Sequence, residues 1–297
     1  MRDLFQFVDP NSSTKTFGGK TVVLGGDFRQ ILPVVPKGTR QDIVSSAINS
    51  LYLWNSCKVL KLTKNLRLST VDAHVDLHSL TEFANWIANI GDGNIGGPNN
   101  GYAEVQIPKS MLLSSNSDHI ATIVNSTFPM FVNGNSSPQF LEGRAILAPT
   151  LDVVNSVNEY MSALHTSESK TYFRSDTVCK ADADNGILAD AHTPEFLNGI
   201  RVSGVPNHSL TLKIGSPVIL MRNIDHSLGL CNGIRLIISK LADRVIEAQI
   251  MTGANQGTKV LIPRMLMSPS DPRLPFKFQR RQFPLMLSYA MTINKSQ

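Results

Sequence analysis

Hydrophobic residues recur along this chain in two patterns, and the pattern changes at about residue 195. Before that point, several segments carry apolar residues three or four positions apart, which is typical of amphipathic helices. Short apolar or alternating runs between these segments are typical of strands. The predicted helices span 42–54, 71–90 and 152–164, and the predicted strands span 21–24, 57–62 and 145–150.

After residue 195 the pattern predicts a small all-β unit. Short apolar or alternating runs are separated by turns, such as the one at Asn232 and Gly233. The segment 167–192 is polar and predicts irregular structure. The predicted strands are 211–214, 217–221, 233–238, 245–251 and 259–262.

Composition changes this picture only slightly. With 297 residues, 42% of them hydrophobic, the chain can form ordinary globular cores in about two domains. A net charge of +5 permits a nucleic-acid partner without identifying one. The cysteines Cys57, Cys179 and Cys231 form no paired motif, which favours a reducing compartment without structural zinc. No signal peptide or membrane-spanning run is evident, so we expect a soluble intracellular protein.

Residues 25–34, with the sequence GGDFRQILPV, carry the strongest functional signal in the chain. They follow the predicted strand 21–24, and ligands of open α/β sheets bind beyond the carboxyl ends of strands. Asp27, Arg29 and Gln30 would emerge there, and an acid, a cation and an amide suit the sensing of a phosphate group. The alternative is a turn that merely ends a strand, with Arg29 on the surface.

These ten residues resemble the third helicase motif of the petite-integration-frequency (Pif-type) DNA helicases, which are RecD-like members of superfamily 1. In that family the glutamine contacts the γ-phosphate of ATP and helps to couple ATP to DNA. The resemblance implies that Gln30 has this catalytic role and that Asp27 and Gln30 bind nucleotide.

Residues 63–68 follow the predicted strand 57–62 and resemble the fourth motif of superfamily 1 helicases. The arginine of that motif reaches ATP across the cleft between two RecA-like domains, and Arg67 matches it. The resemblance implies a catalytic arginine finger that also binds nucleotide. Without the resemblance, a single arginine after a strand is usually a surface residue.

The β-rich region also contains family-like stretches at 206–210, 222–225 and 229–236. They resemble the SH3-like domain inserted in the same helicases, whereas the residues alone indicate only a β meander of unknown role. Around residue 86, the helix and the loop after it recur in family members of transposon origin, which implies the plant and transposon (Helitron) branch.

The resemblance implies an α/β fold with three parts. Residues 1–64 form the C-terminal part of a first, truncated RecA-like domain. Residues 65–190 form the second RecA-like domain, which residues 285–297 complete. Residues 191–284 form the SH3-like insertion.

Two stretches near the C-terminus are candidate DNA contacts. In residues 276–283 aromatic residues alternate with Lys277, Arg280 and Arg281, which can hold a phosphate backbone while rings stack on bases. The alternative is a strand whose phenylalanines pack inward while Lys277 and Arg281 face solvent. Residues 290–297 resemble the fifth motif of the family, which grips the DNA backbone.

That resemblance implies DNA contacts by four residues of the fifth motif. Thr292, Lys295 and Gln297 match the family pattern directly. Many members have histidine where this chain has Asn294, and the plant and transposon branch has asparagine there.

Two other patterns are weaker. Residues 18–21 resemble the end of a P-loop, but Thr14 stands where the first glycine should be and a strand rather than a helix is predicted to follow. We therefore predict a turn. His74 and His78 are one helical turn apart, but no third ligand is evident, so we predict a solvated helix face without metal.

The family function is ATP-driven 5′-to-3′ DNA unwinding, with roles in repair, recombination and telomere maintenance, and it implies a nuclear protein. Intact members use ATP and Mg²⁺ and act on single-stranded DNA. The P-loop, the acidic pair that holds magnesium and the last helicase motif do not occur in this sequence. We therefore expect a partial, ATPase-inactive chain that does not bind ATP tightly, from either a truncated gene model or a transposon remnant. The alternatives are a non-catalytic module that binds single-stranded DNA and an unstable fragment.

Overall fold

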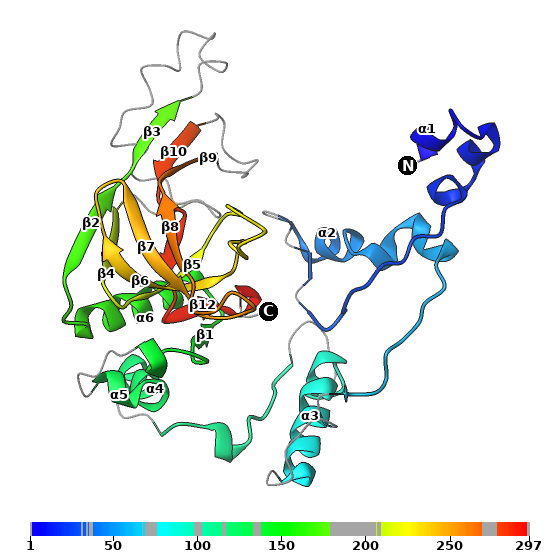
Figure 1. The fold of residues 1–297 in the computed structure, drawn as a ribbon. Helices are drawn as coiled ribbons and strands as arrows, with labels where there is room; N and C mark the ends of the chain where they lie inside the picture. Colours follow the sequence, from blue (N-terminus) through cyan, green and yellow to red (C-terminus); the bar gives the residue numbers. More distant parts are fainter. Residues whose placement is uncertain are drawn as a thin grey trace. The chain divides into compact units, whose positions relative to one another are not determined.

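The computed structural model describes residues 2–30, 32–33, 35, 38–66, 68, 76–97, 103–114, 117–132, 138–178, 206, 209–268 and 278–295 (Figure 1). The chain divides into two compact units, Met1–Leu112 and Leu113–Gln297. None of the helices in the described ranges is long and apolar enough to cross a membrane. Helices and strands both occur, as the sequence predicts.

The first unit is built from short helical segments. Its α-helices are α1 (Arg2–Phe5), α2 (Arg40–Ser45) and α3 (Leu77–Gly91), and its 3₁₀ turns are η1 (Pro10–Thr14), η2 (Thr16–Gly19), η3 (Ile48–Ser50), η4 (Tyr52–Ser56) and η6 (Lys109–Met111).

Helix α2 is shorter than the predicted helix 42–54. It begins with a capping box in which the side chains of Thr39 and Asp42 satisfy each other's backbone amides. Serine side chains end it early, because the hydroxyl of Ser46 donates to the carbonyl of Asp42 and that of Ser50 to the carbonyl of Val44. Two 3₁₀ turns therefore replace the second half of the expected helix.

The two strands predicted in the first unit are wrong. Residues 21–24 and 57–62 have no strand assignment, and the side chains of Val23 and Leu62 are 90% and 102% exposed. A strand requires a neighbour for its backbone hydrogen bonds. Among the described residues of this unit there is no second strand to provide them.

Helix α3 begins at Leu77, where the carboxylate of Asp76 accepts a hydrogen bond from the amide of His78. The predicted start at residue 71 and His74 lie outside the described residues. His78 lies 3.8 Å from Glu82, one turn further along an exposed face. The turn predicted at residues 18–21 is present as the end of η2, where Gly18 and Gly19 have positive φ angles of 68° and 77°.

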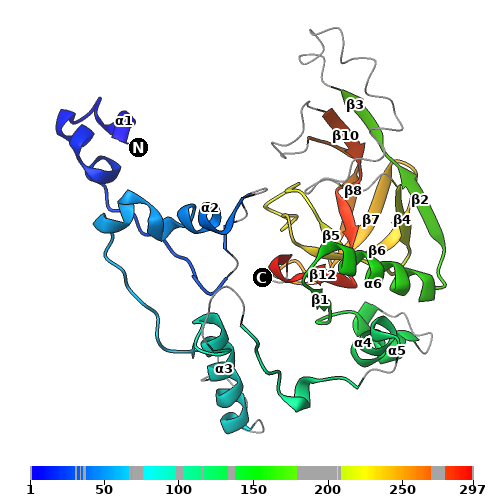
Figure 2. The same ribbon diagram turned by 180° about the vertical axis from the view of Figure 1, so that it is seen from behind.

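The second unit contains a small α/β part. Strand β1 (Ile146–Ala148) pairs in parallel with β12 (Ala290–Thr292), and helix α6 (Leu151–Leu164) follows β1 directly. Helices α4 (His119–Thr127) and α5 (Pro129–Val132) complete this part (Figure 2). Its core contains Val124, Phe128, Leu141, Val157 and Tyr289, all buried.

The predicted strand 145–150 and helix 152–164 are confirmed by β1 and α6. The helix begins one residue earlier than predicted, at Leu151. The hydroxyl of Thr150 caps it by accepting a hydrogen bond from the amide of Val153, so Asp152 lies in the first turn. An acid there still stabilises the positive end of the helix.

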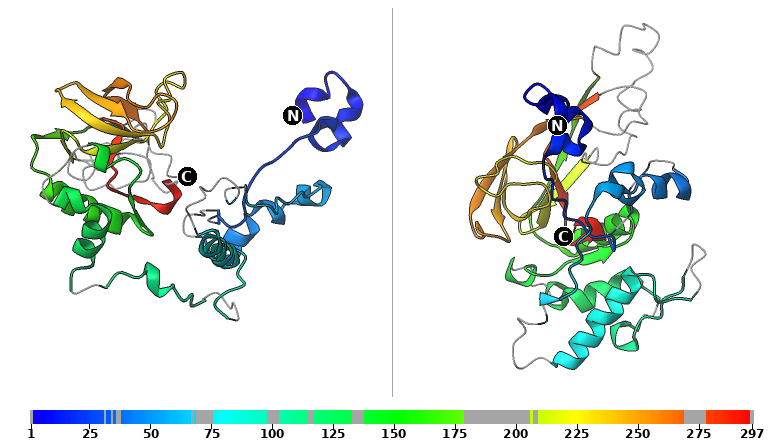
Figure 3. Two further views of the ribbon diagram at one scale, coloured as in Figure 1. Left: turned by 60° about the horizontal axis from the view of Figure 1, so that its bottom comes forward. Right: turned by 90° about the vertical axis from the view of Figure 1, so that its right-hand side faces the viewer.

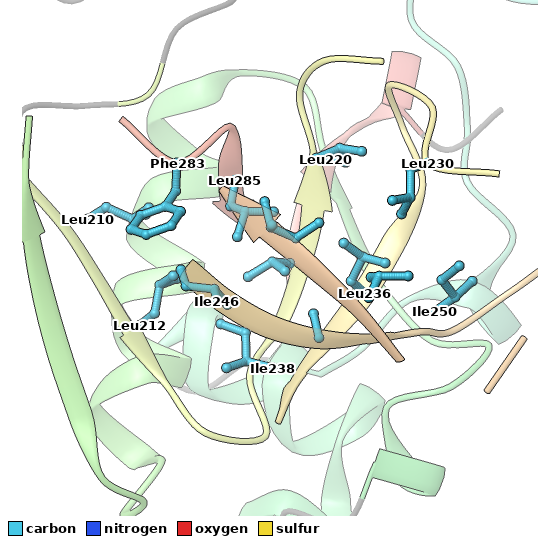
Figure 4. Packing of buried hydrophobic residues seen from close by; sticks show 14 of the residues in the cluster. Leu210, Leu212, Leu220, Leu230, Leu236, Ile238, Ile246, Ile250, Phe283 and Leu285 are labelled. Carbon is cyan, nitrogen blue, oxygen red and sulfur yellow. The ribbon is translucent and has the colours of Figure 1, made fainter. Parts of the chain in front are cut away.

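The β part of the second unit centres on a five-stranded antiparallel sheet in the order β11-β5-β6-β7-β8. Its central strands, between residues 235 and 263, are drawn in gold to orange in Figure 3. Its strands are β5 (Pro217–Leu220), β6 (Arg235–Leu241), β7 (Val245–Ile250), β8 (Lys259–Pro263) and β11 (Leu285–Leu287). Alternate residues of β7 and β8 point inward and form one cluster with Leu220, Leu236 and Phe283 (Figure 4). The predicted strands of this region are therefore confirmed, with the first one present as β4 (Ser209–Lys213).

The prediction of irregular structure for residues 167–192 is partly wrong. Strand β2 (Ser169–Phe173) pairs with β4, and β3 (Ser175–Val178) pairs with β10 (Phe278–Gln282), which also pairs with β9 (Met265–Met267). The polar composition hid an alternation in which Tyr172 and Arg174 face inward. Residues 179–192 lie outside the described ranges.

Strand pairing in the second unit bears on its predicted subdivision. Strand β2, from the predicted second RecA-like domain, pairs with β4 of the predicted insertion. Strand β11, predicted to complete that domain, pairs with β5 of the insertion. The boundaries at 64/65, 190/191 and 284/285 stay predictions, and the hydrogen-bonded ladders cross the last two.

Candidate nucleotide and DNA sites

The candidate phosphate-sensing residues lie in an exposed turn. The amide of Gln30 donates to the carbonyl of Asp27 at 3.2 Å, and the amide of Arg29 donates to the carboxylate of Asp27 at 3.0 Å. This is the local bonding by which aspartate favours turns. Phe28 packs edge-on against Trp54 of η4, with ring centres 5.7 Å apart. The turn therefore presents Gln30 to solvent on a locally ordered backbone.

A contact across 63 residues anchors this turn. The guanidinium of Arg29 donates from Nε and Nη2 to the two carboxylate oxygens of Asp92, at 2.7 and 2.8 Å. Asp92 follows the last residue of α3, and this hydrogen bond holds the pKa of the Asp92 carboxyl below its usual range. A Cβ on Gly91 would lie 2.9 Å from the Arg29 side chain, so only glycine fits this approach. Sequence analysis missed the pair because the two residues are distant in sequence.

Arg67, the predicted arginine finger, lies outside the described residues. Its nucleotide role, like those of Asp27 and Gln30, stays a prediction.

Side chains of β10 point alternately to its two faces, so the basic residues predicted to contact DNA do not all lie on one face. Phe278, Arg280 and Gln282 are fully buried, whereas Arg281 is exposed. Lys277 lies outside the described residues. The burial of Phe278 and the exposure of Arg281 agree with the alternative interpretation, in which this segment is a strand with its phenylalanines packed inward.

The burial of Arg280 requires a correction to its predicted role. Its guanidinium donates to both carboxylate oxygens of Asp176, at 3.1 and 3.2 Å, and to the carbonyl of Pro206 at 2.8 Å. Arg174 Nε lies 3.0 Å from the same carboxylate, and burial beside Arg280 lowers the pKa of Arg174 to about 10. Because a buried guanidinium cannot reach a DNA backbone, we withdraw Arg280 as a direct contact.

The fifth-motif residues follow a parallel strand. Thr292 ends β12 and is half-buried, and the 3₁₀ turn η9 (Ile293–Lys295) comes next, with Lys295 exposed. Lys295 Nζ donates to the side-chain oxygen of Asn232, in a loop of the β part, at 3.3 Å. Asn294 lies within η9, and Gln297 lies outside the described residues. The structure thus places Thr292 and Lys295 at the carboxyl end of β12, where α/β sheets bind ligands.

Two stretches of the chain match protein-family models. Residues 1–101 match the PIF1-like helicase family, and residues 195–241 match the 2B domain of the DNA helicase Pif1. The first match contains the turn at Gln30, and the second contains β4, β5 and Asn232. No curated protein matches the sequence.

Solved helicase structures share the fold at low identity. The Pif1 helicase from Candida albicans is 18% identical with a TM-score of 0.56, and the match covers 100% of this chain and 61% of that one. Bacteroides Pif1 bound to single-stranded DNA is 19% identical with a TM-score of 0.54, and the match covers 100% of this chain and 59% of that one. A complex of Bacteroides Pif1 with ADP-AlF3 and single-stranded DNA is 18% identical with a TM-score of 0.54, and the match covers 100% of this chain and 59% of that one.

These matches confirm the predicted α/β helicase fold and span roughly three-fifths of each solved relative. The two family models match separate places in the chain, and both describe parts of the same kind of helicase. Over these two regions the chain is similar to the Pif1-like helicases.

Proposed function

We propose that this chain forms part of an ATP-dependent DNA helicase that moves 5′-to-3′ along single-stranded DNA. The observation that carries the proposal is the pair of family matches, at residues 1–101 and 195–241, on one chain with the helicase fold. Solved relatives were captured with single-stranded DNA and with ADP-AlF3, which supports DNA and nucleotide as ligands. The corresponding processes are DNA repair, recombination and telomere maintenance in the nucleus, and Asn294 favours the plant and transposon branch.

In the proposed mechanism the exposed turn at Asp27 and Gln30 senses the γ-phosphate, and Arg67 stabilises the charge that develops on it. The Arg29–Asp92 pair would hold the turn in place during this step. Mg²⁺ needs carboxylate ligands beside the phosphates, and phosphate binding needs a P-loop. Because no P-loop sequence occurs in these 297 residues, we expect this chain by itself to bind ATP weakly.

The proposed DNA contacts are Thr292, Asn294, Lys295 and Gln297, together with Lys277 and Arg281. The exposure of Arg281 and Lys295 supports electrostatic binding to phosphates. A second candidate function, single-stranded DNA binding without ATPase activity, is favoured by these exposed cations together with the missing P-loop sequence.

One experiment tests what this chain does by itself. ATPase activity of the 297-residue chain is measured with and without oligo-dT, while fluorescence anisotropy measures oligo-dT binding in the same buffer. We expect binding that weakens with salt and turnover far below the usual enzyme range of about 1–1,000 s⁻¹. DNA-stimulated turnover within that range would establish catalysis by this chain, and the absence of binding would exclude both candidates.

A further inference from the structure

Strand β12 is tied into the second unit by side chains from several elements. Its ladder with β1 is only three residue pairs long, from Ile146 paired with Ala290 to Ala148 paired with Thr292. A short ladder specifies its register weakly, and a slip by one residue would turn every side chain to the other face. The position of Thr292 and the turn after it therefore needs support beyond the ladder.

Asn158 of α6 makes three hydrogen bonds to the backbone, two with β12 and one with the last residue of β11. Its Nδ2 donates to the carbonyls of Leu287 and Ala290, both at 3.1 Å, and its Oδ1 accepts from the amide of Ala290 at 2.8 Å. The asparagine is only 4% exposed, and it lies 132 residues from Ala290 in sequence. Such bonds form together only in one register, because donor and acceptor must both match.

Neighbouring residues hold the same segment from other sides. The hydroxyl of Tyr289 donates to Ser216 Oγ at 3.1 Å and lies 3.0 Å from His165 Nδ1. Arg235 of β6 donates to the carbonyl of Ser288 at 3.0 Å. The backbone immediately before Thr292 is thus anchored to α6, to the start of β5 and to β6.

We propose that Asn158 is a positioning residue for single-stranded DNA binding, because it fixes the register of β12 and so aims Thr292 and Lys295 at the phosphate backbone. The proposal rests on the DNA-binding function proposed above. Asn158 itself, 4% exposed, does not contact DNA. Its amide acts through the strand.

The test compares substitutions of two buried amide side chains that bond to different parts of the backbone. Asn158→Leu removes the three hydrogen bonds to Leu287 and Ala290. The control, Gln282→Leu, removes an equally buried amide on β10, whose Nε2 donates to the carbonyl of Tyr172 at 2.9 Å and whose Oε1 accepts from the amide of Phe283 at 3.0 Å. Both variants should lose thermal stability, so stability alone does not distinguish a positioning role.

A positioning role is distinguished by oligo-dT binding. Binding is measured at a temperature at which circular dichroism shows that each variant is folded. We expect Asn158→Leu to weaken binding about tenfold and to reduce the slope of log affinity against log salt by about 0.7–1.4, the equivalent of one or two phosphates. Gln282→Leu should keep the wild-type affinity and slope. Asn158→Asp, which keeps the shape and the acceptor but not the donor, provides the same comparison if the leucine variant does not fold.

A double-mutant cycle with Lys295→Gln completes the test. If Asn158 aims Lys295, the lysine substitution should cost affinity in the wild type and almost nothing in Asn158→Leu. An unchanged salt slope in Asn158→Leu, with additive losses in the cycle, would overturn the positioning role alone. A wild-type chain that does not bind oligo-dT would overturn the proposed function and this inference together.

Discussion

Arg280 and Arg281 are neighbours in sequence but have opposite environments. One is fully buried against Asp176, and the other is exposed on the far face of β10. A guanidinium taken out of water requires a charged partner, whereas an exposed one remains available to phosphate. The same residue type therefore has a structural role at one position and a candidate binding role at the next.

We predict that substituting these two arginines separates stability from DNA binding. Arg280→Gln should lower the free energy of unfolding by about 3 kcal/mol, because Asp176 loses a buried charged partner. Arg281→Gln should change it by less than about 0.5 kcal/mol and should reduce the oligo-dT salt slope by about 0.7. Urea unfolding and anisotropy titrations measure the two effects. A destabilised Arg281→Gln, or a fully stable Arg280→Gln, would contradict the assignment.

His165 provides a pH-dependent contribution to stability. Burial, and secondarily the charge of Lys213, lower the pKa of its imidazole from the ordinary 6.5. Nδ1 faces the hydroxyls of Tyr289 and Ser216, and Nε2 faces that of Ser167 at 3.0 Å. The folded state therefore favours the neutral ring.

The sign of the pH effect follows from this lowered pKa. Well above about pH 6.5 the ring is neutral in both the folded and the unfolded state, and as the pH falls toward about 6.5 the unfolded chain takes up the proton first. We expect the free energy of unfolding to decrease between about pH 7.5 and 5.5, measured by urea denaturation. His165→Gln should flatten this dependence, whereas His78→Gln, on an exposed helix face, should leave it intact. An identical slope in His165→Gln would contradict the role of His165.

At the scale of elements, the end of α3 and the turn at Asp27–Gln30 depend on each other. The Arg29–Asp92 pair joins them, and Gly91 leaves room for the arginine stem. Both charged side chains are about half exposed, so the pair has the small free energy of a surface interaction. Its effect should be local ordering of the turn rather than stability of the unit.

We predict that Gly91→Ala loosens this turn. The added methyl would lie within 3.0 Å of the Cβ, Cγ and Cδ atoms of Arg29, so the arginine must move away from Asp92. Exchange of the Arg29 and Gln30 amides with deuterium should become about two- to fivefold faster. Gly25→Ala is the control, because a Cβ there meets nothing within 4 Å. Equal exchange in both variants would show that the pair does not order the turn.

At the scale of the whole molecule, the two units differ in buried core. The buried hydrophobic side chains of the described residues all lie in the second unit, most of them in the two clusters around Leu236 and Tyr289. In the first unit, large apolar side chains such as Leu24, Leu60 and Leu62 are 60%, 81% and 102% exposed. Apolar burial is the dominant favourable contribution to folding, so the second unit should be the more stable.

We predict that limited digestion with thermolysin removes the first unit before it cuts the second. Local opening there should cost little free energy, whereas the sheet from β5 to β8 should open only with the second unit as a whole. Mass spectrometry should identify a persistent fragment that begins near residue 113. First cuts within residues 217–263, with residues 1–112 intact, would contradict this order of stability.

The sequence by itself determined the elements whose signals are local. Apolar spacing predicted α6, and short alternating or apolar runs predicted β5 to β8, because one buried face leaves a period that can be read over a few residues. The motif at residues 25–34 likewise indicated the helicase family whose model matches residues 1–101, since its residues are contiguous.

The tertiary structure alone decided which residues act together. The Arg29–Asp92 pair spans 63 residues, the Arg280–Asp176 pair spans 104, and the Asn158–Ala290 bonds span 132. The local spacing of apolar and polar residues does not predict such contacts, because each one forms only after distant elements have packed. The same reason explains the failed strand at residues 21–24: an apolar run has the propensity for a strand, but only a paired neighbour makes it one.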